Sequence, residues 1–87
     1  MKIENSISWN DVFDLLIPRE ATLRELSEQK NNNPEIKNIL RIVSATIEDL
    51  RRIQKQTELS ASSLYDEYQD IKNGILPEVE RVIELYS

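Results

Sequence analysis

Cysteine and histidine are both absent from the 87-residue sequence, and it contains a single glycine, Gly74. Without cysteine the chain forms neither a disulfide nor a thiolate metal site, which fits a reducing compartment. Without histidine it lacks the commonest general base and the commonest ligand of transition metals. One glycine is too few for a glycine-rich phosphate loop. We therefore expect no enzyme: no catalytic residue, no metal site and no cofactor.

Long apolar runs are absent as well. No stretch approaches the roughly 18 apolar residues of a membrane-spanning helix, and the first ten residues, MKIENSISWN, lack the apolar segment of a secretion signal. We expect a cytoplasmic protein with no membrane partner. The composition, 39% hydrophobic and 31% charged, favours folding over disorder, and the length suits one helical domain spanning residues 1–87.

The charges are unevenly distributed along the chain. Residues 1–30 carry 4 − 6 = −2, residues 31–57 carry 5 − 3 = +2, and residues 58–87 carry 2 − 7 = −5. An acidic last third favours binding to the basic surface of a partner protein, because opposite charges on two proteins attract and speed their association. The one basic cluster, Arg51, Arg52 and Lys55, has no interleaved aromatic residues, and Glu48 precedes Arg52 by one helical turn. Nucleic-acid binding is therefore not expected.

The first third of the chain predicts a helix near residues 8–30. Ser8 and Asp11 have the spacing of a capping box. Apolar residues then recur at helical spacing: Trp9, Val12, Leu16, Leu23 and Leu26. Pro18 lies inside this segment, so it should kink the helix, or restart it with Ile17 as the last residue of a first short piece.

The clearest boundary is the linker Asn31–Asn33. Asn33 is a favourable N-cap, and Pro34 fits the first helical position, where its missing N–H costs nothing. We expect a second helix near residues 34–57, packed antiparallel to the first because the connection is short.

Residues 51–66, RRIQKQTELSASSLYD, pose a choice between a turn and a continuous helix. The apolar phase that begins at Ile36 continues without Gly or Pro to Ile71, which favours one long helix in a dimeric hairpin. Against this, the apolar face of such a helix would carry Gln54, Thr57 and Ala61 in place of large aliphatic residues. Ser60 is also a favourable N-cap for a new helix. A turn near Ser60 lets three helices of similar length bury one another, so we predict the turn.

The end of the chain predicts one further break. Asn73–Gly74 resembles a helix C-cap and Pro77 a new start, which divides it into helices near 61–73 and 77–86. The fold we expect is all-α: a three-helix antiparallel bundle with a short C-terminal helical extension. The alternative is the dimeric hairpin with one long continuous helix.

These features favour a small acidic module that binds another protein stoichiometrically, such as an inhibitor, an immunity or antitoxin-like protein, or a phage or mobile-element protein. The alternative is a self-associating structural subunit or a secretion-type chaperone, which would oligomerise through the apolar face of residues 36–75. Candidate partner-binding residues lie on the outer face of the last helix. They are Tyr65, Asp66, Glu67, Asp70, Glu80 and Glu84.

A third hypothesis comes from a family resemblance. The first predicted helix carries a Leu15–Leu16 pair, then Arg19, then Lys30, which resembles the first helix of small all-helical chorismate mutases. The resemblance implies a helical enzyme with a dianionic substrate, for which Arg51 or Arg52 would supply a further cation. It covers the first helix only, and Pro18 lies within it.

Overall fold

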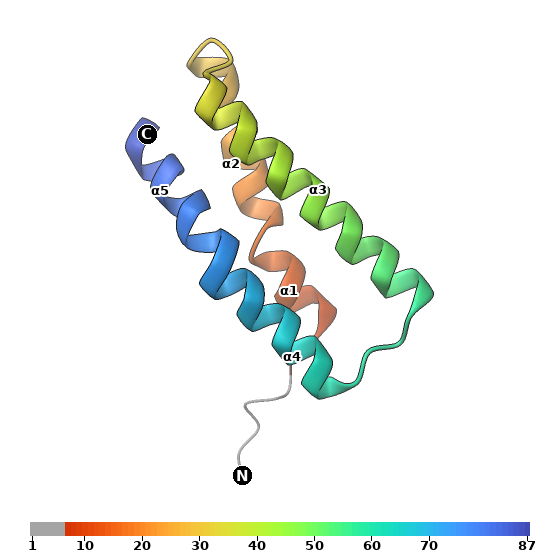
Figure 1. Cartoon of the computed structure of the whole chain (residues 1–87). Helices are drawn as coiled ribbons and strands as arrows, with labels where there is room; N and C mark the ends of the chain where they lie inside the picture. Colours follow the sequence, from red (N-terminus) through yellow and green to blue (C-terminus); the bar gives the residue numbers. More distant parts are fainter. Residues whose placement is uncertain (1–6) are drawn as a thin grey trace.

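The structure, a computed structural model, describes residues 7–87, and the first six residues of the predicted 1–87 domain lie outside it. The fold is all-α. Three helical rods run up, down and up alongside one another (Figure 1). The first rod comprises α1 (Trp9–Asp14) and α2 (Ile17–Gln29), the second is α3 (Pro34–Gln56), and the third comprises α4 (Ala61–Asp70), the π-helical turn η1 (Ile71–Ile75) and α5 (Leu76–Tyr86). None of these helices is long and apolar enough to cross a membrane.

The first rod begins at the expected capping box. The Asp11 N–H donates to Ser8 Oγ at 3.3 Å, and the Ser8 N–H donates to Asp11 Oδ2 at 3.0 Å. The rod is interrupted at residues 15–16 and restarts with Pro18 in the first turn of α2. A restart was predicted, but Ile17 is the first residue of the second piece, not the last of the first. The physical reason is that a first-turn proline needs no backbone N–H.

The hairpin between α2 and α3 forms as predicted. Asn31 and Asn32 adopt φ of 56° and 58°, the left-handed conformation that asparagine tolerates better than most residues. The side-chain oxygen of Asn33 then accepts from the backbone N–H groups of Glu35 at 2.8 Å and Ile36 at 3.2 Å. The chain therefore reverses over three asparagines, and α3 packs antiparallel on α2 (Figure 1).

Residues 57–60 form a connection between helices, so the alternative of one continuous helix is wrong. α3 ends at Gln56 with Thr57 in an extended conformation. The next helix starts after Ser60, whose Oγ accepts from the Ser63 N–H at 3.2 Å. The cap satisfies a backbone donor that a helix start leaves without an intrahelical partner.

The third rod has no break between residues 73 and 77, contrary to the prediction from Asn73–Gly74 and Pro77. The backbone passes through a π-helical turn in which the Leu76 N–H donates to the Ile71 carbonyl, five residues back, and α5 follows directly. Gly74 does not adopt a positive φ, so it is not a left-handed helix cap. Pro77 lies in the first turn of α5, where it is tolerated.

The π turn places the apolar residues before it and after it on the same face of the third rod. Val79 follows Ile71 by 79 − 71 = 8 positions, which at about 100° per residue would place it about 80° around an α-helix from Ile71. A π turn holds about one residue more than an α turn, so it removes this offset. As a result Ile71 and Val79 are both buried, at 6% and 0% exposure.

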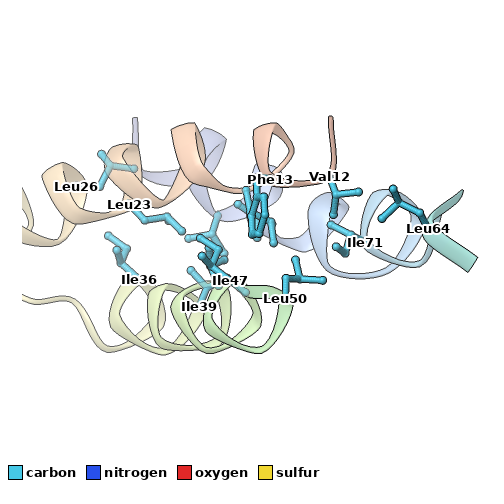
Figure 2. Packing of buried hydrophobic residues seen from close by; sticks show 14 residues of the cluster. Val12, Phe13, Leu23, Leu26, Ile36, Ile39, Ile47, Leu50, Leu64 and Ile71 are labelled. Carbon is cyan, nitrogen blue, oxygen red and sulfur yellow. The ribbon is translucent and has the colours of Figure 1, made fainter. Parts of the chain in front are cut away.

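All three rods contribute to one core (Figure 2). Trp9 and Tyr68 pack against it but are only partly buried, and Ile39 is more deeply buried than its neighbour Leu40. The core residues are Val12, Phe13, Leu16, Leu23, Leu26, Ile36, Ile39, Val43, Ile47, Leu50, Leu64, Ile71, Val79 and Val82.

Candidate functional site

The six predicted partner-binding residues all lie on the third rod, in two groups separated by η1. Tyr65, Asp66, Glu67 and Asp70 belong to α4, and Glu80 and Glu84 belong to α5. The four residues Asp66, Asp70, Glu80 and Glu84 are exposed. Tyr65 and Glu67 are half-buried, so the expectation of an exposed Tyr65 is only partly met. The reason is that Tyr65 directly follows the buried Leu64, on the flank of the helix.

The α4 group presents an acidic surface. Asp66 and Asp70 are one helical turn apart, and at about 100° per residue both project away from the buried Leu64. Within residues 7–87, the carboxylates of Asp66, Glu67 and Asp70 form neither an ion pair nor a side-chain hydrogen bond. Their charges are therefore not neutralised by the rest of the described fold.

Glu80 is exposed but is paired with a residue of the first rod. Arg19 on α2 donates to Glu80 Oε2 from Nη2 at 2.7 Å and from Nε at 3.2 Å. The same guanidinium donates from Nη1 to the Leu15 carbonyl at 3.3 Å. Surface ion pairs of this kind contribute about 0–1 kcal/mol, so the contact adds little to the stability of the fold.

A groove lies between α2 and α5, next to this ion pair. It has a volume of about 590 Å³. Its residues are Pro18, Arg19, Thr22, Glu80, Ile83, Glu84 and Ser87. Glu84 forms no ion pair with another residue of the described chain, so the groove carries one guanidinium against two carboxylates, 1 − 2 = −1. Sequence reasoning missed the groove because its two walls are about sixty positions apart in the chain.

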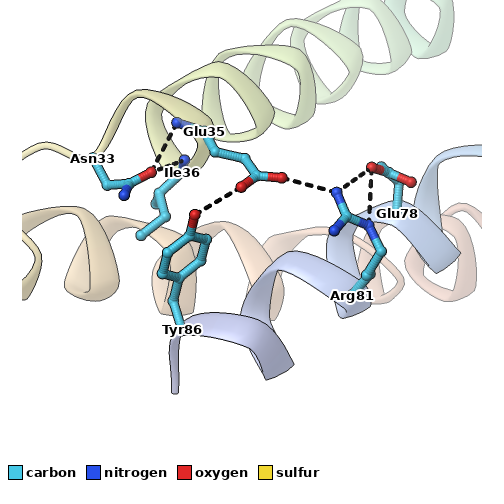
Figure 3. A network of polar contacts seen from close by, with 6 residues as sticks. All are labelled: Asn33, Glu35, Ile36, Glu78, Arg81 and Tyr86. Atoms are coloured by element: carbon cyan, nitrogen blue, oxygen red, sulfur yellow. Dashed lines mark hydrogen bonds and ion pairs between the residues drawn. The ribbon is translucent and has the colours of Figure 1, made fainter.

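Tyr86 belongs to a polar network between the second and third rods (Figure 3). Its hydroxyl donates to Glu35 Oε1 at 2.7 Å, and Arg81 Nη2 donates to Glu35 Oε2 at 2.9 Å. Arg81 also donates from Nη2 and Nε to Glu78 Oε2, at 2.7 and 3.2 Å. The network links the first turn of α3 to α5.

The same contacts shift three pKa values. The hydrogen bond from Tyr86, with help from Arg81, lowers the pKa of Glu35 below its usual 4.5. The Glu35 carboxylate in turn raises the pKa of Tyr86 above its usual 10.0. Hydrogen bonds to Glu78 and Glu35 raise the pKa of Arg81. The shifts favour a charged Glu35 and a protonated Tyr86, the states in which the hydrogen bond between them forms.

The basic cluster Arg51, Arg52 and Lys55 lies in the last part of α3. Arg52 pairs with Asp49, one turn before it, and not with Glu48 as its spacing suggested. Arg51 and Lys55 form no ion pair with the described residues. At about 100° per residue, Lys37, Arg41 and Lys55 share one face of α3, which is exposed at all three positions. The second rod is therefore the positive one, with five cations and three carboxylates in residues 34–56, 5 − 3 = +2.

Of the residues in the mutase resemblance, Arg19 is already engaged by a carboxylate. The Arg19 guanidinium is held by the Glu80 carboxylate, and Glu84 lies in the same groove. Two carboxylates in one groove repel a dianionic substrate. Within residues 7–87, no group of three or more Asp and Glu side chains is arranged to hold a metal ion.

In comparisons with known proteins, no protein-family model, no curated protein and no solved structure matches the chain.

Proposed function

We propose that the protein is a stoichiometric binding module that attaches to a basic surface of another protein through the outer face of its third rod. In physical type it is like small inhibitors and immunity proteins, which act by covering a surface. The supporting observation is the charge of this rod. Residues 61–86 carry two cations and six carboxylates, 2 − 6 = −4.

The third rod keeps most of this charge available to a partner. Glu78 and Glu80 are paired with Arg81 and Arg19. The other four carboxylates have no ion pair with a described residue: Asp66, Glu67, Asp70 and Glu84. Unpaired surface carboxylates attract a positive surface over about one Debye length, roughly 8–10 Å at physiological ionic strength. Tyr65, half-buried beside Asp66, adds an aromatic contact of the kind that anchors interfaces.

Charge reversal tests this proposal directly. We expect the wild type to capture a partner from extracts of its source cells, and the variant Asp66→Lys with Asp70→Lys to lose it. Calorimetry with the purified partner should give one-to-one binding that weakens as salt is added. The matched control is Glu25→Lys with Glu28→Lys, which changes the net charge equally at exposed positions of α2.

Circular dichroism establishes that both double variants remain helical. Equal capture by the two variants would contradict the proposed surface. The absence of any captured partner, with the wild type intact and folded, would contradict the function itself.

A further inference from the structure

The groove between α2 and α5 is open to solvent and is lined by residues of both helices. α2 and α5 lie side by side in the first and third rods, both pointing away from the end of the bundle that holds α1 and α4 (Figure 1). Two adjacent helices leave between them a trough in which a further helix packs, as in four-helix bundles and helix-in-groove complexes. The opening between these two helices measures about 590 Å³.

The walls of the groove differ in chemistry. On the α2 side, Pro18 and Thr22 are one turn apart and have short side chains that let a partner approach closely. On the α5 side, Ile83 is half-buried and presents an aliphatic surface, with Glu80 and Glu84 beside it. Such a site suits an occupant with both an apolar stripe and polar groups next to it.

The groove has a net negative charge, so it favours an occupant with a positive charge. Arg19 is already neutralised by Glu80, so Glu84 is the carboxylate left for a partner. The third rod adds to the negative field, because residues 61–86 carry 2 − 6 = −4. A lysine or arginine beside the apolar stripe would therefore meet an opposite charge.

We propose that the α2–α5 groove binds a basic amphipathic helix of the partner protein, with an aliphatic side chain against Ile83 and a cation against Glu84. This inference rests on the proposed function and adds to it the site and the kind of segment that is bound. A second copy of the chain is not the occupant, because its own basic helix, α3, presents no exposed apolar stripe. Five of its aliphatic side chains are buried, and Ile42 is its one exposed large aliphatic residue.

The test uses a synthetic helical peptide of leucine and lysine, with the leucines on one face, and the same peptide with glutamate replacing lysine. Amide spectra of the labelled protein should shift for residues lining the groove when the lysine peptide is added, and not with the glutamate peptide. Shifts confined to α4, or equal shifts with both peptides, would overturn the groove as the site.

Two variants give a second readout. Thr22→Trp fills the groove and should abolish binding of the lysine peptide, and Glu84→Gln should weaken it by about tenfold, the equivalent of about 1.4 kcal/mol. The controls are Ala45→Trp and Glu48→Gln, at exposed positions of α3, which should bind the peptide as the wild type does. Unchanged binding to Thr22→Trp, or equal loss in variant and control, would contradict the proposal.

The groove and the function can fail separately. If the captured partner binds Thr22→Trp normally but is lost from Asp66→Lys with Asp70→Lys, the groove is not its site and the acidic binding module stands. If the lysine peptide binds the groove but the wild type captures no cellular partner, the groove binds basic helices and the proposed function fails.

Discussion

The hydroxyl of Tyr86 donates a hydrogen bond to Glu35 Oε1 at 2.7 Å and so joins two residues 51 positions apart. Glu35 lies in the first turn of α3 and Tyr86 in the last turn of α5, so the contact closes the bundle at the end where α2 turns into α3 (Figure 3). Arg81 binds the other oxygen of the same carboxylate.

This contact predicts a stability that declines at both ends of the pH range. Because the pKa of Glu35 is lowered on folding, its contribution is present above the usual 4.5 and is lost as the pH falls through the folded value. Because the pKa of Tyr86 is raised on folding, its contribution is present below the usual 10.0 and is lost as the pH rises through the folded value. Urea unfolding midpoints across the pH range measure both effects.

The variant Tyr86→Phe distinguishes the contribution of Glu35 and Tyr86 to the pH dependence of stability from that of other titrating groups. Without the hydroxyl, the pKa of Glu35 should move back toward 4.5 in a carboxyl-detected titration, and the alkaline loss of stability should diminish. Tyr65→Phe is the control, because the Tyr65 hydroxyl has no hydrogen bond with the described residues. If both variants keep the wild-type pH profile, the contact is without thermodynamic effect.

Ile47→Ala should destabilise the protein by about 2–5 kcal/mol, the usual cost of truncating a buried aliphatic side chain. Ile47 is 3% exposed and belongs to the core cluster. The matched control is Ile42→Ala on the same helix, where the side chain is 39% exposed and the loss should be much smaller. Chemical denaturation of both variants measures the difference, and equal losses would mean that the helix phase is wrong.

Ala61→Pro should leave the free energy of unfolding within about 1 kcal/mol of wild type. Ala61 is the first residue of α4, directly after the Ser60 cap, where a proline is accommodated. Ala45→Pro, inside α3, should cost about 3 kcal/mol or more, because it removes a backbone hydrogen bond and creates a clash. A severe loss at both positions would argue for helix, not a connection, through residues 57–60.

Deleting Gly74 should convert the π turn into a regular α turn and leave the protein folded. The deletion reduces the spacing from Ile71 to Val79 to 8 − 1 = 7 positions, which an α-helix brings to one face in two turns. Deleting Ala45 from α3 is the control, because it turns every following core residue by about 100° and should unfold the bundle. Melting curves compare the two, and unfolding by both deletions would show that the π turn is required.

Gly74→Ala should stabilise the protein by about 0.5–1 kcal/mol. Gly74 is exposed, its φ is not positive, and no atom lies within 4 Å of the Cβ that alanine would add. Thermal unfolding measures the change, and a loss of stability would indicate that the π turn needs the flexibility of glycine.

The sequence alone determined where each of the three rods begins and how the rods are connected. The caps at Ser8, Asn33 and Ser60 each accept from a backbone group two or three residues away. Such contacts depend only on local residue order, so pattern and residue type were enough to predict them. The antiparallel hairpin followed from the short asparagine linker for the same reason.

The tertiary structure decided the features that depend on residues distant in the chain. Asn73, Gly74 and Pro77 read locally as a helix end and restart, yet the helix continues through a π turn, because burying Ile71 and Val79 against the other rods outweighs local preference. Residue type equally marked Glu80 and Glu84 as surface acids. Only the packing of α5 beside α2 assigned Glu80 to Arg19, 61 positions away, and left Glu84 in the groove.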